Sequence, residues 1–407
     1  MKLIQIPKEK YDEYRLTLMF ESYKWDPQFL DNNTIAKHVL VLSQEEYVEL
    51  KQLTEAIDKE TRAAEEFLNS HLECTKILKL PKKFHKKIKL MKNYNKDEHV
   101  RLMRYDFHPI KDGQWAVSEV NSDVPGGFAE ASLMPQLAID ASGIQNCWFK
   151  KFSDIIIESI VKKVPKNGKI MFVHCTSYSD DRQVMQFLGD QLTKIGFKVI
   201  YGAADHIHFK DKKAISILDG NEGELDAIIR FTPIEWIKNI RPKKWGGYFN
   251  TETVSCNHPI AIFAQTKKFP FVWDILEKND ISIATWRSLL PETIRVKDIK
   301  GREGFIFKPA YGRVGEKIGI KESCTKKEFR QIMTEVKLFP WKYIAQKRFI
   351  SKPLIGADGK EYHLCLGSYT VDGKQAGLYA RISDTPRIDS NAADIPVIIE
   401  RRTNNDK

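Results

Sequence analysis

The stretch RYDFHPIKDGQWAVSEVNSDVPGGFAE, residues 104–130, has the pattern of two short β-strands joined by a tight turn. Residues 104–108 alternate polar and aromatic side chains, residues 111–113 (Lys-Asp-Gly) are typical of a hairpin turn, and residues 115–120 are rich in strand-forming side chains. Because residues two apart in a strand point to the same face, each predicted strand has one polar face. These faces carry Arg104, Asp106 and His108 in the first strand, and Glu119, Asn121 and Asp123 in the second.

The pairing of these two faces predicts a cation site. A hairpin that sets Asp106 opposite Glu119 and Asn121 directs two carboxylates and an amide toward one point. Such hard oxygen ligands suit Mg²⁺, which is commonly shared with substrate phosphates. An edge hairpin with a solvated polar face explains the same pattern without any metal. The motif alone does not separate the two interpretations.

Length and composition are those of a globular protein with an ample core. The chain has 407 residues, of which 42% are hydrophobic and 29% charged, and this predicts two or three subdomains. No apolar run reaches the length of a membrane span, and residues 1–14 lack the apolar core of a signal peptide. The six cysteines are far apart and lack the spacing of a zinc site. We therefore expect a cytoplasmic protein with reduced cysteines and no membrane partner.

The positive charge is concentrated in one segment. The net charge is +11, and residues 76–96 alone contain nine lysines. No aromatic platform or nucleic-acid-binding motif accompanies these lysines. We therefore expect a solvated surface that attracts anionic substrates, and not a nucleic-acid partner.

The chain divides into four regions. Residues 1–98 are predicted to be mainly helical, with a long helix over 44–71, and residues 99–165 contain the hairpin. Residues 166–252 follow a strand–helix–strand order that predicts a parallel α/β subdomain, and residues 253–407 form the fourth region. Ligands collect at the carboxyl ends of parallel strands. The polar residues expected at those ends are Asp180, Asp181, Arg230 and Thr232, although Asp180 and Asp181 are equally suited to capping the following helix.

A second motif, FKPAYGRVGEK at residues 307–317, is suited to phosphate binding. Lys308 ends a predicted strand, and Gly312 and Gly315 would let backbone N–H groups approach phosphate oxygens, with Arg313 adding positive charge. The motif differs from the P-loop, and an ordinary hairpin explains it as well. Further candidates are Lys267 before the sequence KFPFVW, Gln346 on a strand beside a possible base pocket, and Arg381 at the end of a hairpin.

Together these segments resemble the glutathionylspermidine synthase family, a branch of the ATP-grasp ligases. The resemblance covers roughly residue 100 to the end and depends on the order of the segments. They are RYDFHP, SEVNSDVPGGFAE, FVH, RFTPIEW, TKKFPFVW, FKPAYGRVG, IAQKRF, GSYTVDGKQAGLYAR and ADIPVIIE. The resemblance implies an ATP-grasp fold of mixed α+β and α/β type, with an inserted parallel subdomain like a pre-ATP-grasp domain and a helical N-terminal region.

The resemblance also implies a role for each candidate residue. Mg²⁺ would be held by Asp106, Glu119 and Asn121, and ATP phosphates by Lys267, Lys308 and the Gly312–Gly315 loop. Gln346 would line the adenine pocket, Arg381 would lie near the triphosphate, and Arg104 and Arg313 are the catalytic candidates. The remaining residues would face the substrates: Asp180 and Asp181 the amine, Arg230 and Thr232 the acid.

The implied reaction is an ATP- and Mg²⁺-dependent ligation of a carboxylate to an amine through an acyl phosphate. The bifunctional members carry an amidase domain, for which we expect no counterpart in this chain. Residues 124–127 (VPGG) and the tail at 387–393 also depart from the family pattern, so an amino acid or peptide is as good a substrate candidate as glutathione and a polyamine. The alternatives are a kinase-like relative without an amine acceptor, and a non-catalytic protein that binds a partner through its basic surface.

Overall fold

The centre of the molecule is an antiparallel sheet built around the predicted hairpin. The computed structural model describes residues 1–240, 245–301, 304–312, 318–320 and 323–402. The strand order in this sheet is β21-β20-β19-β5-β6, and the short β18 (Leu354–Ile355) pairs with β19 beside this path. The bounds are β5 (Leu102–Pro109), β6 (Trp115–Asn121), β19 (Glu361–Val371), β20 (Lys374–Ser383) and β21 (Ala393–Ile395).

The register of the hairpin is the predicted one. Asp106 lies opposite Glu119, and Arg104 lies opposite Asn121. Beyond this point a β-bulge inserts Ser118, and such a bulge changes the local twist of the strand. Asp123 does not continue the polar face, because β6 ends at Asn121 and the chain then turns away.

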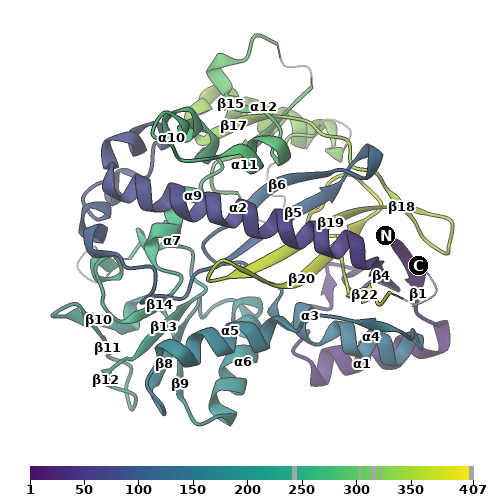
Figure 1. Cartoon of the computed structure of the whole chain (residues 1–407), viewed down its shortest axis with the longest axis horizontal. Helices are drawn as coiled ribbons and strands as arrows, with labels where there is room; N and C mark the ends of the chain where they lie inside the picture. Colours follow the sequence, from purple (N-terminus) through teal and green to yellow (C-terminus); the bar gives the residue numbers. More distant parts are fainter. Residues whose placement is uncertain (241–244, 302–303, 313–317, 321–322, 403–407) are drawn as a thin grey trace.

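One face of this sheet packs against the long helix α2 (Gln44–Ser70). The helix begins with a capping box between Ser43 and Glu46, which satisfies backbone N–H groups at its first turn. Its buried apolar residues include Leu50 and Ile57, and Figure 1 shows the helix running obliquely across the strands of the sheet. The predicted helix over residues 44–71 is confirmed.

The opposite face of the sheet packs against two helices, α3 (Phe128–Ser132) and α5 (Phe152–Lys163). Phe152 packs on Tyr369 of β19 with ring centroids 4.4 Å apart. The short helix α4 (Met134–Ser142) follows α3 and packs on α1 (Lys8–Glu21). The polar residues of β5 share this face, beginning with Arg104, which lies opposite Tyr369.

The two ends of the chain meet in a second sheet with the order β1-β4-β22-β7. The N-terminal region is therefore helical over α1 and α2, but it also supplies two strands to this sheet and a small hairpin of β2 (Gln28–Phe29) and β3 (Asn32–Asn33). Figure 1 shows both termini on the same side of the molecule. The strands are β1 (Lys2–Gln5), β4 (His38–Leu42), β7 (Cys147–Trp148) and β22 (Val397–Glu400).

The predicted parallel α/β subdomain is present. Its four strands have the order β14-β13-β8-β9, and every neighbouring pair is parallel. Helix α6 (Ser179–Lys194) connects β8 to β9, and the short α7 (Ile234–Ile237) follows β13. The strands are β8 (Lys169–Val173), β9 (Lys198–Gly202), β13 (Ala227–Arg230) and β14 (Val254–Cys256).

Besides the central sheet and the parallel subdomain, the protein has a third lobe, which lies above the hairpin in Figure 1. It contains the sheet β15-β17-β16 and helix α12 (Lys326–Leu338), with the shorter α10 (Trp273–Glu277) and α11 (Ala284–Leu289) beside it. Its strands are β15 (Thr293–Arg295), β16 (Phe305–Pro309) and β17 (Tyr343–Lys347). Phe307, Ile332 and Val336 belong to a small core of its own, separate from the main core of the protein.

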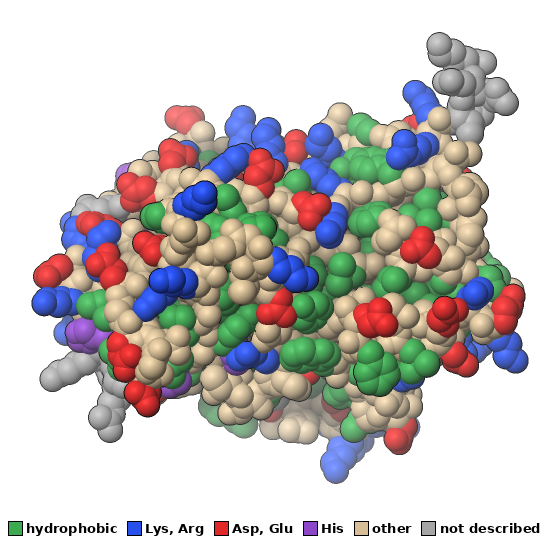
Figure 2. Space-filling view, turned by 90° about the horizontal axis from the view of Figure 1, so that it is seen from below, with side chains coloured by type: hydrophobic (Ala, Val, Ile, Leu, Met, Phe, Trp, Pro, Cys, Tyr) green, Lys and Arg blue, Asp and Glu red, His purple; other side chains and the backbone are tan. Residues whose placement is uncertain are grey.

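The lysine-rich segment forms three short 3₁₀ turns, η1 (Leu72–Leu78), η2 (Lys82–Phe84) and η3 (Ile88–Asn93). Its apolar residues, including Leu78 and Phe84, are buried, whereas most of its lysines are exposed. On the face drawn in Figure 2, acidic and basic side chains are interspersed. Within the described part of the chain, no helix combines the length and apolar character that crossing a bilayer requires.

Candidate active site

The polar face of the hairpin is a connected cluster. The Arg104 guanidinium contacts the Asp106 carboxylate twice, with Nε–Oδ1 at 2.7 Å and Nη2–Oδ2 at 3.0 Å. The Asn121 side-chain amide donates to Asp106 Oδ2 at 2.9 Å. These contacts gather three residues predicted from the sequence at one end of the sheet.

The predicted phosphate lysines meet the hairpin from distant parts of the chain. Lys267 Nζ lies 2.8 Å from Glu119 Oε2. Lys308, near the end of β16, donates to the carbonyl oxygen of the bulge residue Ser118 at 3.2 Å. The third lobe and the central sheet therefore share one charged site.

Burial and charge determine the protonation of this cluster. Burial lowers the pKa of Lys308 to about 8, although the nearby Glu119 partly opposes the shift. Burial by itself would raise the pKa of Glu119, but Lys267 and Lys308 hold it below its ordinary value. Glu119 is consequently ionised at neutral pH, and Lys308 is a cation close to its titration range.

The Gly312 end of the phosphate loop also joins the site. Lys267 Nζ donates to the Gly312 carbonyl at 2.7 Å, and the Lys267 backbone N–H donates to the Ala310 carbonyl at 2.9 Å. Arg313 and Gly315, which the sequence places in the same loop, lie outside the described residues. The backbone at Ala310 and Gly312 is thus held by Lys267, the lysine that pairs with Glu119.

Gln346 lies in a cavity that extends from Glu119 and Lys267 between the third lobe and the hairpin. Its side-chain amide donates to Thr293 Oγ1 at 3.0 Å, while its Oε1 is buried without a partner. A buried acceptor of this kind requires a donor from a ligand or from water. The exocyclic amino group of a purine is one such donor. The other lining residues include Trp286, Leu290 and Ile344.

The donor set of the hairpin fits Mg²⁺ by its chemistry. Asp106 and Glu119 supply carboxylate oxygens, and Asn121 donates through its nitrogen to Asp106, which leaves its amide oxygen as a further candidate. Among the described residues, no group of three His, Cys, Asp or Glu side chains forms a ready-made metal site. Two carboxylates and an amide match an ion that completes its coordination with water and phosphate.

Arg381 lies on the same face of the sheet, two strands away from β5. It is opposite Cys365 on β19, while Gly367, two residues further along β19, is opposite Asp106. Its Nη2 donates to the carbonyls of Asp389 and Ala392 at 2.7 and 3.0 Å. Arg381 thus holds the loop between β20 and β21 beside the site.

Sequence reasoning missed the residues that shape the surroundings of Arg104. A Cβ at Gly367 would lie only 2.6 Å from Arg104 Cδ, so glycine makes room for this side chain. The Arg104 guanidinium also lies 5.0 Å from the ring centroid of Tyr379, a distance typical of a cation–π contact. Only the strand register brings these residues together, and no local pattern reveals it.

Sequence reasoning also missed a buried charge cluster centred on Lys24. Its Nζ lies 2.6 Å from Asp394, 2.8 Å from Asp26 and 3.1 Å from Glu130, and the side chain is 2% exposed. Tyr379 donates its hydroxyl proton to Asp394 at 2.6 Å. Through this hydrogen bond, the cluster positions the Tyr379 ring that packs on Arg104.

Arg230 is placed differently from the other candidate residues. Its four terminal N–H groups donate to both carboxylate oxygens of Asp123, to the Thr232 carbonyl and to the Asn257 carbonyl. Its side chain is only 2% exposed. Thr232 is buried, and its hydroxyl lies 3.9 Å from Cys175 Sγ. Arg230 thus joins the parallel sheet to the chain that follows β6.

Asp180 and Asp181 occupy the first turn of α6. Asp180 is exposed, and Asp181 accepts a hydrogen bond from the Cys175 backbone N–H at 3.4 Å. This position suits the helix dipole as well as a cationic ligand. It lies at the carboxyl end of β8, as the sequence predicted.

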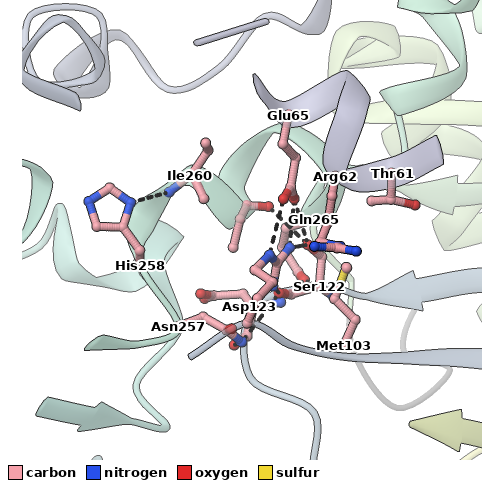
Figure 3. A network of polar contacts seen from close by, with 12 residues as sticks. Thr61, Arg62, Glu65, Met103, Ser122, Asp123, Asn257, His258, Ile260 and Gln265 are labelled. Carbon is pink, nitrogen blue, oxygen red and sulfur yellow. Dashed lines mark hydrogen bonds and ion pairs between the residues drawn. The ribbon is translucent and has the colours of Figure 1, made fainter. Parts of the chain in front are cut away.

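The chain after β6 is held by a buried polar network (Figure 3). Gln265 Oε1 accepts the backbone N–H groups of Ser122 and Asp123, both at 2.9 Å. Arg101 forms a double contact with Glu65 of α2, at 2.6 and 3.0 Å, and also reaches Ser122. This network fixes the end of the hairpin strand that carries Asn121.

The fold is of the ATP-grasp type, with a carboxylate-bearing hairpin that faces a lysine-bearing lobe. Residues 8–400 match the family model described as glutathionylspermidine synthase preATP-grasp, so the chain belongs to the glutathionylspermidine synthase family. The match begins well before residue 100, where the sequence resemblance started. The predicted family and fold class are confirmed, and the protein is an ATP-grasp-type ligase.

Two further comparisons add little to this assignment. A solved structure described as a putative gamma-glutamylcysteine synthetase from Methylobacillus flagellatus KT is similar at 14% identity and a TM-score of 0.45, covering 85% of this chain and 88% of that chain. No curated protein sequence matches the chain significantly.

Proposed function

We propose that the protein uses Mg²⁺ and ATP to activate a carboxylate as an acyl phosphate, which an amine then converts into an amide. The observation that carries this proposal is the charged site shared by the hairpin and the third lobe. Lys267 and Lys308 face Glu119 there, beside a cavity that is also lined by Gln346, whose buried Oε1 has no partner. Cations, carboxylates and an adjoining recess lined by apolar side chains suit a nucleotide triphosphate and its metal.

Each residue of the site has a proposed task. Asp106, Glu119 and Asn121 would hold Mg²⁺, which when bound supplies charge neutralisation at the phosphates. Lys267 and Lys308 bind the triphosphate, and Gln346 accepts a hydrogen bond from the base. The Arg104 guanidinium is fixed by Asp106 and Tyr379, so that it orients the carboxylate of the acid substrate. Gly312, Gly315 and Arg313 complete the proposed phosphate environment, and Arg381 lies beside it, where its Nη2 holds the loop between β20 and β21.

The substrates are proposed to be a small carboxylate and an amine that approach along the carboxyl end of the parallel sheet. Thr232 lies there on the proposed acid side, and Asp180 and Asp181 lie on the proposed amine side. We propose a supporting role for Arg230, because Asp123 and two carbonyls occupy its terminal donors. A single amino acid or a short peptide fits this assignment as well as glutathione or a polyamine.

Calorimetry with Mg·ATP tests the nucleotide site. The natural chain is expected to bind Mg·ATP with micromolar affinity, whereas Lys308→Ala and Asp106→Ala lose at least tenfold, about 1.4 kcal/mol. Lys297→Ala, an exposed lysine near the same lobe, is the matched control and should bind normally. Absence of Mg·ATP binding by the natural chain would refute the proposal.

Hydroxylamine trapping tests the acyl phosphate. With Mg·ATP and a panel of amino acids and short peptides as acids, the acid that is activated should release phosphate and yield a hydroxamate. Supplying amines in place of hydroxylamine then identifies the acceptor. Phosphate release without any hydroxamate, for every acid that stimulates it, would favour a kinase-like reaction instead.

A further inference from the structure

The loop between β20 and β21, residues 384–392, connects the third lobe with the face of the central sheet that carries the site. Arg387 in this loop lies 2.8 Å from Glu328 Oε1 of α12, and its Nη1 also contacts Cys324 Sγ at 3.4 Å. The Arg387 side chain is only 12% exposed. The loop thus reaches the lobe through a guanidinium that is largely withdrawn from water.

The other end of the loop is held by the central sheet. Arg381 of β20 donates to the carbonyls of Asp389 and Ala392, and the Asp389 carboxylate lies 3.3 Å from Arg387 Nε. A continuous polar chain therefore runs from Arg381 through Asp389 to Arg387 and then to Glu328. Arg381 shares its face of the sheet with Asp106, so this chain begins beside the site.

The third lobe has a hydrophobic core of its own, so its position depends on contacts such as this one. Its core, which includes Phe307, Ile332 and Val336, is separate from the main core. A lobe with its own core can shift as one body, and its position then depends on the contacts that cross to the rest of the protein. Lys308 and Gln346 are both on this lobe, so a shift would change the distance between these residues and Glu119.

We propose that Arg387 is a positioning residue that holds the third lobe over the hairpin. A change in the contacts of Arg381 with the loop then changes the position of the lobe at the nucleotide site. This inference rests on the proposed nucleotide site. The direction of coupling follows from the contacts. A ligand anion that engages Arg381 competes with the loop carbonyls for its donors, and the loop carries Arg387 with it. Loss of the Arg387–Glu328 contact leaves the lobe less fixed and weakens nucleotide binding.

The test measures nucleotide affinity and lobe protection, neither of which requires turnover. The probe is Mg²⁺ with the non-hydrolysable analogue AMP-PNP, bound to Arg387→Gln, to Glu328→Gln and to the double variant. Each single variant should raise the Kd about tenfold, and the double variant should be no weaker than either, because both remove the same contact. The exchanged pair Arg387→Glu with Glu328→Arg should recover most of the affinity.

A second readout separates positioning from general stability. Hydrogen exchange of α12 should slow when the natural chain binds Mg·AMP-PNP, and this protection should shrink in Arg387→Gln. Arg295→Gln is the matched control, since Arg295 pairs with Asp298 in the same part of the chain at i,i+3. It should keep both the affinity and the protection.

The possible failures are distinguishable. If the natural chain binds Mg·AMP-PNP and the Arg387 variants bind equally well with normal α12 protection, the positioning role is overturned while the nucleotide site stands. If the variants lower only the melting temperature, the contact is structural and the proposal is again overturned. If the natural chain fails to bind Mg·AMP-PNP, the nucleotide site falls and the positioning role falls with it.

Discussion

The contacts of Arg230 favour a supporting role over the substrate role predicted for it, and one substitution separates the two. Sequence reasoning placed this arginine on the acid-substrate side, whereas its terminal donors are used by Asp123 and by two backbone carbonyls. Arg230→Met keeps most of the volume of the side chain and removes the charge. The substitution should therefore destabilise the fold and leave nucleotide affinity unchanged.

The magnitude follows from the burial of the pair. The Asp123 side chain is 0% exposed, and the Ile234 backbone N–H is its other donor at 2.7 Å. Removing one partner of a buried ion pair leaves an uncompensated charge, which typically costs about 3–5 kcal/mol. Because the Ile234 N–H remains, we expect about 3 kcal/mol, the lower end of that range. Arg230→Met with Asp123→Leu removes both charges and should cost less than Arg230→Met alone.

Denaturant unfolding of these variants provides the measurement. Arg287→Met is the matched control, because Arg287 forms comparable ion pairs with Asp274 and Glu277 while 42% of its side chain is exposed. An exposed pair of this kind contributes at most about 1 kcal/mol. If Arg230→Met loses no more stability than this control, and the double variant is the least stable, the supporting role is refuted. If Arg230→Met instead weakens binding of the acid substrate and keeps normal stability, Arg230 is a substrate-binding residue.

Three further predictions follow from the site. Gly367→Ala places a methyl group 2.6 Å from Arg104 Cδ, so it should cost about 1–3 kcal/mol of stability in denaturant unfolding and lower phosphate release by at least about tenfold. Affinity for Mg·AMP-PNP should fall as pH rises above about 8, where Lys308 loses its proton. Lys268→Met removes the other lysine with a pKa of about 8 and should keep the same pH dependence. An affinity of the natural chain that does not change with pH would contradict the role of Lys308 in phosphate binding. Lys24→Met should lower the melting temperature strongly at pH 7.5 and less at pH 5. Burial is the main reason that the pKa of Asp26 is raised to about 6, so at pH 5 Asp26 is protonated and the repulsion among the carboxylates around position 24 is smaller. Equal losses at both pH values would contradict this role of Asp26.

The parts of the fold that were predictable are those with a local signal. Alternation in residues 104–108 and strand propensity in residues 115–120 predicted the two strands, and the Lys-Asp-Gly turn predicted their connection, so the pairing of Asp106 with Glu119 followed. The strand–helix–strand order likewise predicted the parallel sheet. Periodicity and turn chemistry are properties of neighbouring residues, and a single sequence shows them directly.

The parts that were not predictable depend on register between distant strands. Gly367 faces Arg104 only because β19 pairs with β5 in one particular alignment. Lys24 meets Asp394 across 370 residues, and neither has a neighbour that marks it as buried. Arg230 follows a buried strand in sequence, as a substrate residue would, and its pairing with Asp123 appears only in three dimensions.

The ion pairs of the proposed site predict that metal and nucleotide bind there together. Arg104 is paired with Asp106, and Lys267 with Glu119, so each partly buried cation already has a carboxylate partner. A lysine that turned to a phosphate alone would leave Glu119 without a partner, and an unpaired buried carboxylate is costly. A divalent cation that arrived alone would likewise meet carboxylates held by their cations. When both enter, the lysines take phosphates and the carboxylates take the metal, so every charge keeps a partner, and the two ligands are therefore expected to favour each other's binding.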